Sequence, residues 1–162
     1  MDTSIPPAST ANKSRMVFQN AYNAPMGEIR EKVRLTNLAD MAARPQSGKK
    51  RRKVRSIEVE AVVDAGAVMS VIPIHIVQKL GIEIRARRMA RYADGRTDDV
   101  GITSGVLFEI QGRDTIEEAL VLGDQVLIGQ TVLEKLDLLA DCAGRRLTPN
   151  PDRPNQPVIM IR

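Results

Sequence analysis

Apolar and polar side chains alternate most regularly in the stretch from Ile57 to Val63. Ile, Val and Ala occupy every second position there, and two glutamates lie between them. A period of two is typical of a β-strand that buries one face and exposes the other. The alternation stops at Asp64-Ala65-Gly66, where small residues and a glycine predict a sharp turn. We therefore expect a half-buried strand that ends next to Asp64.

The rest of the chain shows shorter apolar segments that are separated by turn residues. Asp94-Gly95 is a strong hairpin signal, so we interpret residues 84–110 as an antiparallel section with its tip at 93–96. We expect further strands over residues 28–36, 119–122, 126–128 and 146–148, an extended apolar run over 68–73, short helices over 74–80 and 131–139, and an edge strand over 158–161. This order predicts a mainly β fold with one or two short helices.

The two ends of the chain differ in composition from its middle. Residues 1–25 are polar and proline-bearing, which predicts a flexible N-terminal tail, and residues 152–162 predict an extended C-terminal tail. Residues 26–151 are long enough for one domain with a core of its own. No segment approaches the roughly 20 apolar residues that a membrane helix needs, and the first residues lack a signal-peptide pattern. We expect a cytoplasmic protein without membrane contacts.

Composition narrows the possible chemistry. Aromatic residues make up 2% of the chain, and the formal net charge is +4. The cationic run Lys49–Lys53 falls in a long surface connection over residues 37–53, and we interpret it as a solvated loop. Nucleic-acid binders more often combine a basic stripe with stacking aromatic residues, so we do not expect nucleic acid as a partner. One cysteine, Cys142, and one histidine, His75, exclude an intrachain disulfide and argue against zinc, so we expect no metal and no cofactor.

Three features follow one another along the chain. The apolar strand runs into Asp64-Ala65-Gly66-Ala67, a hairpin tip carries Ala93-Asp94-Gly95, and Leu127-Ile128-Gly129 leads into a helix. In this order and spacing, over residues 27–151, the chain resembles the retropepsin-like aspartic proteases, particularly the small bacterial members of that clan. The resemblance implies a closed β-barrel of the acid-protease half-fold type that works as a homodimer.

The chemistry of that class explains why one such element per chain requires two chains. Peptide hydrolysis by water needs a base that activates the water and an acid that protonates the substrate. Two carboxylates roughly 3 Å apart supply both, because they hold one proton between them. This chain has one Asp-x-Gly-Ala element, so the second carboxylate must come from a second copy across a two-fold axis. We expect Asp64 to be the catalytic residue of a homodimeric aspartic endopeptidase that acts on peptides or proteins.

The resemblance also implies roles for the residues around Asp64. The hairpin near residue 94 resembles a flap that closes over bound peptide and excludes water. Substrate-binding roles are implied for Gly66, Ala67, Ala93, Asp94 and Gly95. Support of the active-site loop and of the dimer is implied for Ala65, Leu127, Ile128 and Gly129. From the residues alone, substrate contact and turn geometry explain Asp94 equally well. For His75 and Cys142 we expect structural roles.

Two departures from the family pattern keep other interpretations open. Family members usually carry Thr or Ser at the position of Ala65, where the hydroxyl braces the two loops across the dimer axis. A missing hydrogen bond costs about 1 kcal/mol, so a catalytically impaired or silent module for dimerisation or peptide binding is an alternative. Val68 and Gln130 replace an acid and an arginine that viral members often pair, so the dimer contacts should differ. A third alternative is a small nucleic-acid-binding protein that uses residues 49–53 and loses affinity steeply with salt.

Overall fold

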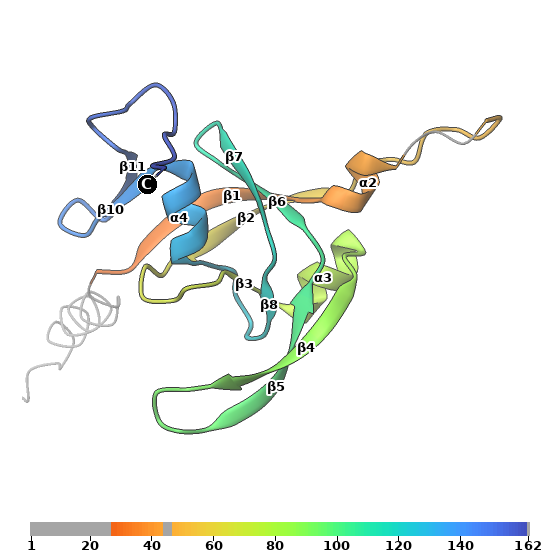
Figure 1. The fold of residues 1–162 in the computed structure, drawn as a ribbon, viewed down its shortest axis with the longest axis horizontal. Coiled ribbons are helices and arrows are strands. Elements are labelled where there is room, and N and C mark those ends of the chain that lie inside the picture. Colours follow the sequence, from red (N-terminus) through yellow and green to blue (C-terminus); the bar gives the residue numbers. More distant parts are fainter. Residues whose placement is uncertain (1–26, 44–46, 162) are drawn as a thin grey trace, which may run out of the picture.

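The computed structural model describes residues 27–43 and 47–161, so the tail predicted over residues 1–25 lies outside the described part (Figure 1). Its strands are β1 (Ile29–Asn37), β2 (Ser56–Val63), β3 (Val71–Ile72), β4 (Ile84–Arg91), β5 (Thr97–Thr103), β6 (Val106–Ile110), β7 (Arg113–Glu117), β8 (Leu120–Val121), β9 (Leu127–Ile128), β10 (Leu138–Asp141) and β11 (Arg146–Pro149). Its helices are α2 (Leu38–Ala42), α3 (Ile74–Leu80) and α4 (Gln130–Leu136).

One curled sheet dominates the molecule. Its strands follow the order β4-β5-β8-β3-β9-β2-β1-β6-β7, and β10 and β11 form a separate two-stranded sheet. The predicted mainly β class with few helices is confirmed. The prediction of a closed barrel is wrong for this chain, because β4 and β7 remain as two edges and the sheet curls only into a half-barrel (Figure 1).

The helix predicted over residues 131–139 ends earlier, at Leu136. Asp137 adopts a left-handed backbone conformation with φ 52°, which closes the helix. Leu138 and Leu139 then pair with Pro149 and Thr148 in the β10–β11 ladder. The apolar spacing that suggested a longer helix therefore belongs to a helix end followed by a strand.

Two further local predictions need correction. The surface connection predicted over residues 37–53 contains the short helix α2, which begins where the Asn37 side chain accepts hydrogen bonds from the backbone N–H groups of Ala39 and Asp40. The edge strand predicted over residues 158–161 does not form, and this segment has no regular secondary structure. No helix of the described residues is long and apolar enough to span a membrane.

The strand order places β9 between two strands that are consecutive in the chain. β2 runs parallel to β9, and β3 runs antiparallel to β9 on its other side. The loop over residues 64–70 must therefore pass over the end of β9 to connect β2 with β3. This crossing brings the residues after β2 next to the residues after β9, although they are more than 60 positions apart in sequence.

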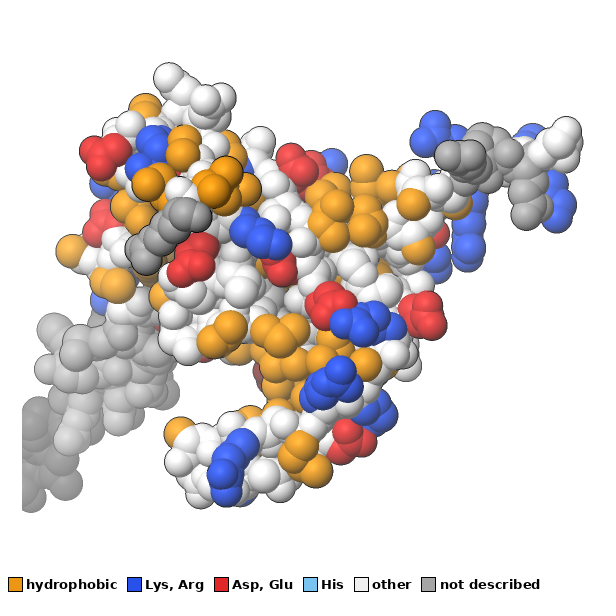
Figure 2. Space-filling model, in the orientation of Figure 1, with side chains coloured by type: hydrophobic (Ala, Val, Ile, Leu, Met, Phe, Trp, Pro, Cys, Tyr) orange, Lys and Arg blue, Asp and Glu red, His pale blue; other side chains and the backbone are white. Residues whose placement is uncertain are grey.

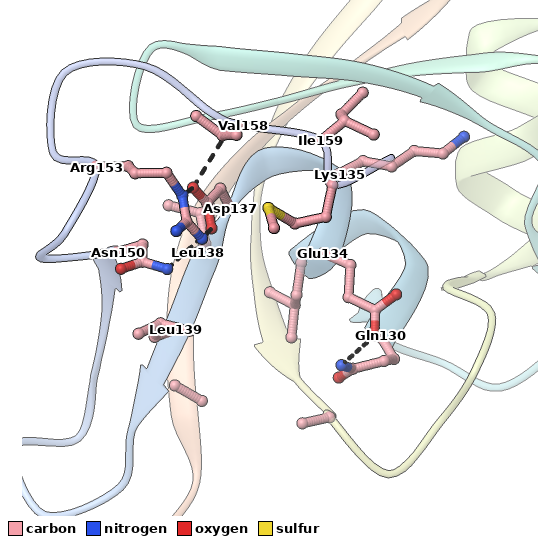
Figure 3. Close-up of a pocket in the computed structure, with 14 residues that line it drawn as sticks. Gln130, Glu134, Lys135, Asp137, Leu138, Leu139, Asn150, Arg153, Val158 and Ile159 are labelled. Atoms are coloured by element: carbon pink, nitrogen blue, oxygen red, sulfur yellow. Dashed lines mark hydrogen bonds and ion pairs between the residues drawn. The ribbon is translucent and has the colours of Figure 1, made fainter. Parts of the chain in front are cut away.

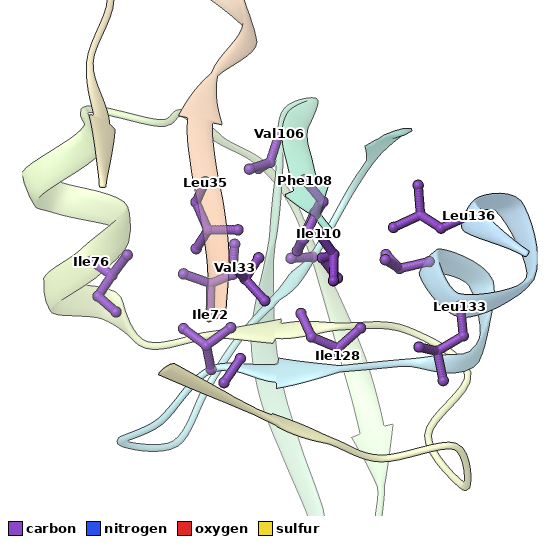
Figure 4. Close-up of a cluster of buried hydrophobic side chains, with 14 of the residues drawn as sticks. Val33, Leu35, Ile72, Ile76, Val106, Phe108, Ile110, Ile128, Leu133 and Leu136 are labelled. Atoms are coloured by element: carbon purple, nitrogen blue, oxygen red, sulfur yellow. The ribbon is translucent and has the colours of Figure 1, made fainter. Parts of the chain in front are cut away.

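The hydrophobic core fills the inside of the curl (Figure 4). Phe108 of β6 is fully buried and lies opposite Leu35 of β1 in the ladder. Helix α3 contributes Ile76, Val77 and Leu80, and helix α4 contributes Val132, Leu133 and Leu136. As the composition suggested, aliphatic side chains make up almost all of this cluster, and burying them is the main favourable term in folding.

Candidate active site

Asp64 occupies the first position after β2, at a tight turn. Its backbone N–H donates to the carbonyl oxygen of Ile128 at 2.9 Å, and its carbonyl oxygen accepts from Ala67 at 3.2 Å. Its carboxylate oxygen Oδ1 accepts a hydrogen bond from the backbone N–H of Gly66 at 3.0 Å. Oδ2 has no hydrogen-bond partner in the described part of the chain, and no Lys or Arg there forms an ion pair with Asp64. The side chain is thus oriented by backbone alone and keeps one oxygen free.

The loop after Asp64 is held against the start of α4. Gln130 donates its backbone N–H to the carbonyl of Ala67 at 2.7 Å, and Thr131 donates both its backbone N–H and its hydroxyl to the carbonyl of Val68 at 3.1 Å. The buried Ser70 accepts from the backbone N–H of Gly129 through its Oγ at 2.9 Å. These bonds fix the loop from both ends, so the position of the carboxylate is set by rigid elements.

Glycine is required at residue 129 because two backbone segments approach closely there. A Cβ at this position would lie 2.5 Å from the carbonyl carbon of Met69 and 2.8 Å from the backbone nitrogen of Ser70. No side chain fits at those distances. A Cβ at Gly66 would lie 3.3 Å from Oδ1 of Asp64, a tight contact with the carboxylate. The structure therefore brings Asp64, Gly66, Ala67 and the Leu127–Gly129 segment together, and their roles in catalysis, substrate binding and loop support stay predictions.

A row of apolar side chains lies on the sheet face that the core does not use. Cross-strand partners share a face of the sheet, and the ladder registers align Ala86, Ile102, Leu120, Val71, Leu127 and Val62 across neighbouring strands. None of these six belongs to the main hydrophobic cluster, whereas Ile72 and Ile128, the next residues of β3 and β9, do. Val71 and Ile102 of this row are nevertheless buried, with exposed fractions of 6% and 7%, and the other four residues are half-buried, so the row offers only part of its apolar surface beside the Asp64 loop.

The β4–β5 hairpin forms an arm that curves toward the loop after β2 (Figure 1). Figure 2 shows a hollow between this arm and the body of the molecule, with hydrophobic side chains at its back. The loop that carries Asp64 lies on one side of the hollow and the hairpin tip on the other.

The hairpin tip is internally hydrogen-bonded. Tyr92 donates its backbone N–H to Arg96 at 2.8 Å, and Gly95, with φ 86°, donates to Tyr92 at 2.9 Å. Asp94 accepts from the backbone N–H of Arg96 at 3.0 Å and from its Nε at 2.7 Å, and these hydrogen bonds lower the pKa of Asp94. Turn geometry thus accounts for Asp94. The tip residues Ala93, Asp94 and Gly95 are exposed, and their contact with substrate stays a prediction.

A cavity of about 660 Å³ adjoins the other side of the Asp64 loop. Its wall includes Ala65 of that loop, residues of α4 and β10, and the C-terminal segment from Val158 to Met160 (Figure 3). The exposed fractions of Ile159 and Met160 are 73% and 76%. This places large exposed apolar side chains next to the turn that carries Asp64.

A polar cluster that sequence reasoning missed holds the C-terminal segment beside this cavity. Asp137 accepts from Nε and Nη2 of Arg153 at 2.7 and 2.9 Å and from the side-chain amide of Asn150 at 3.1 Å (Figure 3). The hydrogen bonds from Arg153 are the main cause that lowers the pKa of Asp137 to about 2. The buried Arg113 donates to the carbonyl oxygens of Leu136, Asp137, Arg153 and Pro154. No local sequence pattern predicts these hydrogen bonds of Asp137 and Arg113, because the residues that they join are distant in sequence.

Comparison with known proteins gives only distant likenesses. No protein-family model matches the chain, and no curated protein matches it. The structure of EIAV protease complexed with the inhibitor HBY-793 is 20% identical over 48% of this chain and 75% of that chain, with a TM-score of 0.38. The retroviral protease-like domain of Ddi1 from Leishmania major is 18% identical over 82% of this chain and 95% of that chain, with a TM-score of 0.48. At these values the likenesses assign neither a family nor an activity to this chain.

The described residues offer one kind of reactive centre at the hollow. No group of three or more His, Cys, Asp or Glu side chains that could hold a metal ion occurs among them. Asp64 is a carboxylate with a free oxygen, held by backbone at the edge of a hollow that has an apolar floor. A single carboxylate can act as a base or as an acid, and doing both in one step needs a second one.

Proposed function

We propose that this chain is an aspartic endopeptidase of the retropepsin-like type that works as a homodimer, with Asp64 as the one catalytic residue of each subunit. The observation that carries the proposal is the geometry of Asp64: a carboxylate fixed by the Gly66 N–H, without a cation partner among the described residues, at the mouth of the hollow. The Asp-x-Gly-Ala sequence and the close approach at Gly129 support the same assignment. A cytoplasmic location stays a prediction from the sequence.

In the proposed dimer, Asp64 and the partner's Asp64 share one proton. The ionised carboxylate removes a proton from a water molecule, and the water oxygen attacks the carbonyl carbon of the peptide bond. The protonated carboxyl gives its proton to the carbonyl oxygen, which forms a tetrahedral diol. When the C–N bond breaks, a proton passes to the leaving nitrogen, so the products are a carboxylic acid and an amine and one carboxyl is again protonated.

The substrate would lie extended in the hollow, between the Asp64 loop and the β4–β5 arm. An extended peptide exposes alternate side chains to the same side. The half-buried members of the row, Leu120, Leu127 and Val62, would contact the apolar ones among them. Closing of the hairpin over the peptide would exclude water from the dyad and strengthen its electrostatics.

The second copy would approach on the side of Ala65. Ala65 is exposed and adjoins the cavity next to α4. The exposed side chains Ile159, Met160 and Ile161, with Leu139 at 46% exposure, supply apolar area on the same side. A two-fold axis close to Asp64 would bury this area against its counterpart, which is a self-complementary arrangement.

The decisive experiment compares Asp64→Asn with Asp124→Asn on a labelled denatured protein substrate. Asn keeps the shape of the carboxylate and cannot accept the proton from water, so the rate should fall at least about 100-fold. Asp124 is exposed and forms no ion pair among the described residues, so its variant should cleave like the unmodified chain. Equal amounts of unmodified and Asp64→Asn subunits are then mixed and allowed to exchange partners. The mixture should have about one quarter of the activity of the unmodified chain at the same total subunit concentration, because only dimers with two carboxylates work. Equal cleavage by Asp64→Asn, or one half of the activity in the mixture, contradicts the proposal.

A silent module that dimerises or binds peptides is the second candidate. The observation that favours it is Ala65, whose methyl group cannot donate or accept a hydrogen bond across the dimer axis. Among the described residues the Asp64 carboxylate receives one hydrogen bond, from its own loop. If the two loops are braced too weakly, the two carboxylates would not be held at the distance that sharing a proton requires.

A further inference from the structure

The positive charge of this protein is concentrated in one loop. Lys49, Lys50, Arg51, Arg52 and Lys53, called here the basic loop, are five consecutive cations, and all five are exposed. They contribute +5 while the whole chain carries +4, so the rest of the chain sums to −1. Figure 2 shows blue side chains gathered on a projection at the far right of the molecule, beyond α2.

Carboxylates of the described residues leave this charge almost unneutralised. Arg52 approaches Asp40 at 3.9 Å, and none of the other four cations forms an ion pair there. The arginines of the β4–β5 arm behave differently, because Arg87 and Arg96 each bind an aspartate through Nε. The arm is neutralised only in part, because Arg88 and Arg91 form no ion pair among the described residues. Four of the five cations of the basic loop have no ion pair there and can bind an anion.

The base of the basic loop is rigid. The buried carboxylate of Asp40 accepts from the backbone N–H, Nε and Nη2 of Arg55 at 3.1, 2.7 and 2.8 Å. Asn37 caps α2 and also donates to the carbonyl oxygens of Leu80 and Gly81. The loop is thus anchored to α2 and to the end of α3, which lowers the entropy that its root would lose on binding.

A groove beside the loop extends the cationic surface. It has a volume of about 330 Å³ and is lined by two guanidinium groups, Arg34 and Arg51, together with the hydroxyl residues Thr36 and Ser56. Guanidinium groups bind phosphate oxygens through paired N–H groups, and hydroxyls add further hydrogen bonds. Glu109 is the one carboxylate in the lining. It offsets only one of the two arginines, so the groove keeps a net positive charge.

We infer that the basic loop and this groove bind the phosphate backbone of a nucleic acid, without reading its bases, at a site separate from Asp64. The scarcity of aromatic residues argued against stacking on bases, and it does not affect contacts with phosphates. β2 has eight residues and connects the loop region to Asp64, which corresponds to roughly 26 Å, so bound nucleic acid would leave the hollow open.

Fluorescence anisotropy with a labelled 20-base-pair DNA duplex of arbitrary sequence tests this inference on the full chain. If three phosphates are neutralised, the affinity should fall about 40-fold between 50 and 200 mM salt. The variant K49Q/K50Q/K53Q should lose about tenfold or more at 50 mM salt. The matched control K32Q/K79Q/R145Q removes the same charge from exposed positions elsewhere and should change the affinity less than twofold.

Three outcomes overturn the inference. Equal losses in the two triple variants would mean that only the net charge matters. Salt-independent binding or no binding would exclude phosphate contacts. Displacement of the duplex by polyglutamate at an equal concentration of charges would assign the loop to acidic proteins instead. The Asp64→Asn variant should bind the duplex as the unmodified chain does, so this result is independent of the proposed protease activity.

Discussion

Two aspartates near the same cavity differ in the number and kind of hydrogen bonds that their carboxylates accept. Asp64 follows β2 and accepts one hydrogen bond, from the backbone N–H of Gly66 at 3.0 Å. Asp137 follows α4 and accepts four, including two from the Arg153 guanidinium. Both residues end a regular element at a turn, and both turns contribute to the cavity wall. The difference is in the partners that their carboxylates have.

This contrast distinguishes a carboxylate that binds a cation, Asp137, from one that binds none among the described residues, Asp64, for which we propose a catalytic role. The pKa of Asp137 is lowered to about 2, mainly by the hydrogen bonds from Arg153, so this group stays ionised and cannot carry a proton near neutral pH. The same holds for Asp40, whose pKa Arg55 lowers to about 2. Asp64 has no such cation among the described residues.

Of the substitutions at the Asp64 and Asp137 turns, Asp137→Asn should lower the stability of the fold most. The amide N–H₂ of Asn would face the Arg153 donors, so hydrogen bonds would be lost and donors would oppose donors. The midpoint of thermal unfolding should fall by roughly 5 °C or more, while the proposed cleavage activity per folded molecule survives at low temperature. The control is Asp141→Asn, because Asp141 pairs with Arg146 at the surface and such pairs contribute little. If both variants unfold at the same temperature, Asp137 does not hold the C-terminal segment.

Acid should weaken the fold through the same group. A carboxyl whose pKa is lower in the folded state stabilises the fold above the pKa of the unfolded chain, near 4, and loses this contribution as the pH falls toward about 2. The free energy of unfolding should therefore fall between pH 4 and pH 2, as measured by denaturant titration at a fixed protein concentration. In Asp137→Asn the fall should be shallower. An equally steep fall in the variant would show that other carboxyls dominate.

The features near Asp64 could be predicted because their signals are local. The period of two over residues 57–63 identified β2, the small residues after it identified the turn, and Asp94-Gly95 identified the hairpin tip. Gly129 was predicted as support of the loop, and that role stays a prediction; the structure shows that a Cβ there would lie 2.5 Å from the carbonyl carbon of Met69. Local preference and tertiary structure agree at these positions.

The features near Asp137 could not be predicted because their causes are distant in sequence. Leu138 and Leu139 fit a helical pattern with the preceding residues, and only pairing with β11 makes them a strand. Arg153 lies 16 residues from Asp137, and Arg113 reaches the same place from β7. The row on the second face of the sheet likewise depends on the strand order, which places β9 between β2 and β3. The candidate site around Asp64 could be predicted from a short stretch of sequence. The contacts that hold the surrounding elements in place join residues that are distant in sequence, so they could not.

Ala65→Thr should produce the smallest change, and it tests how firmly the Asp64 turn must be held. Residue 65 is exposed, so the larger side chain fits without disturbing the core. A hydroxyl there would add a hydrogen bond across the dimer axis, worth about 1 kcal/mol, which corresponds to about a fivefold lower dissociation constant of the dimer. Ala65→Ser should do the same, and Ala65→Val, which has the shape of Thr without its hydroxyl, should not. Sedimentation and cleavage rates measured together distinguish the two candidate functions. A rise in cleavage with Thr and Ser identifies a protease whose dyad is loosely braced, whereas tighter dimers with no cleavage identify a silent module.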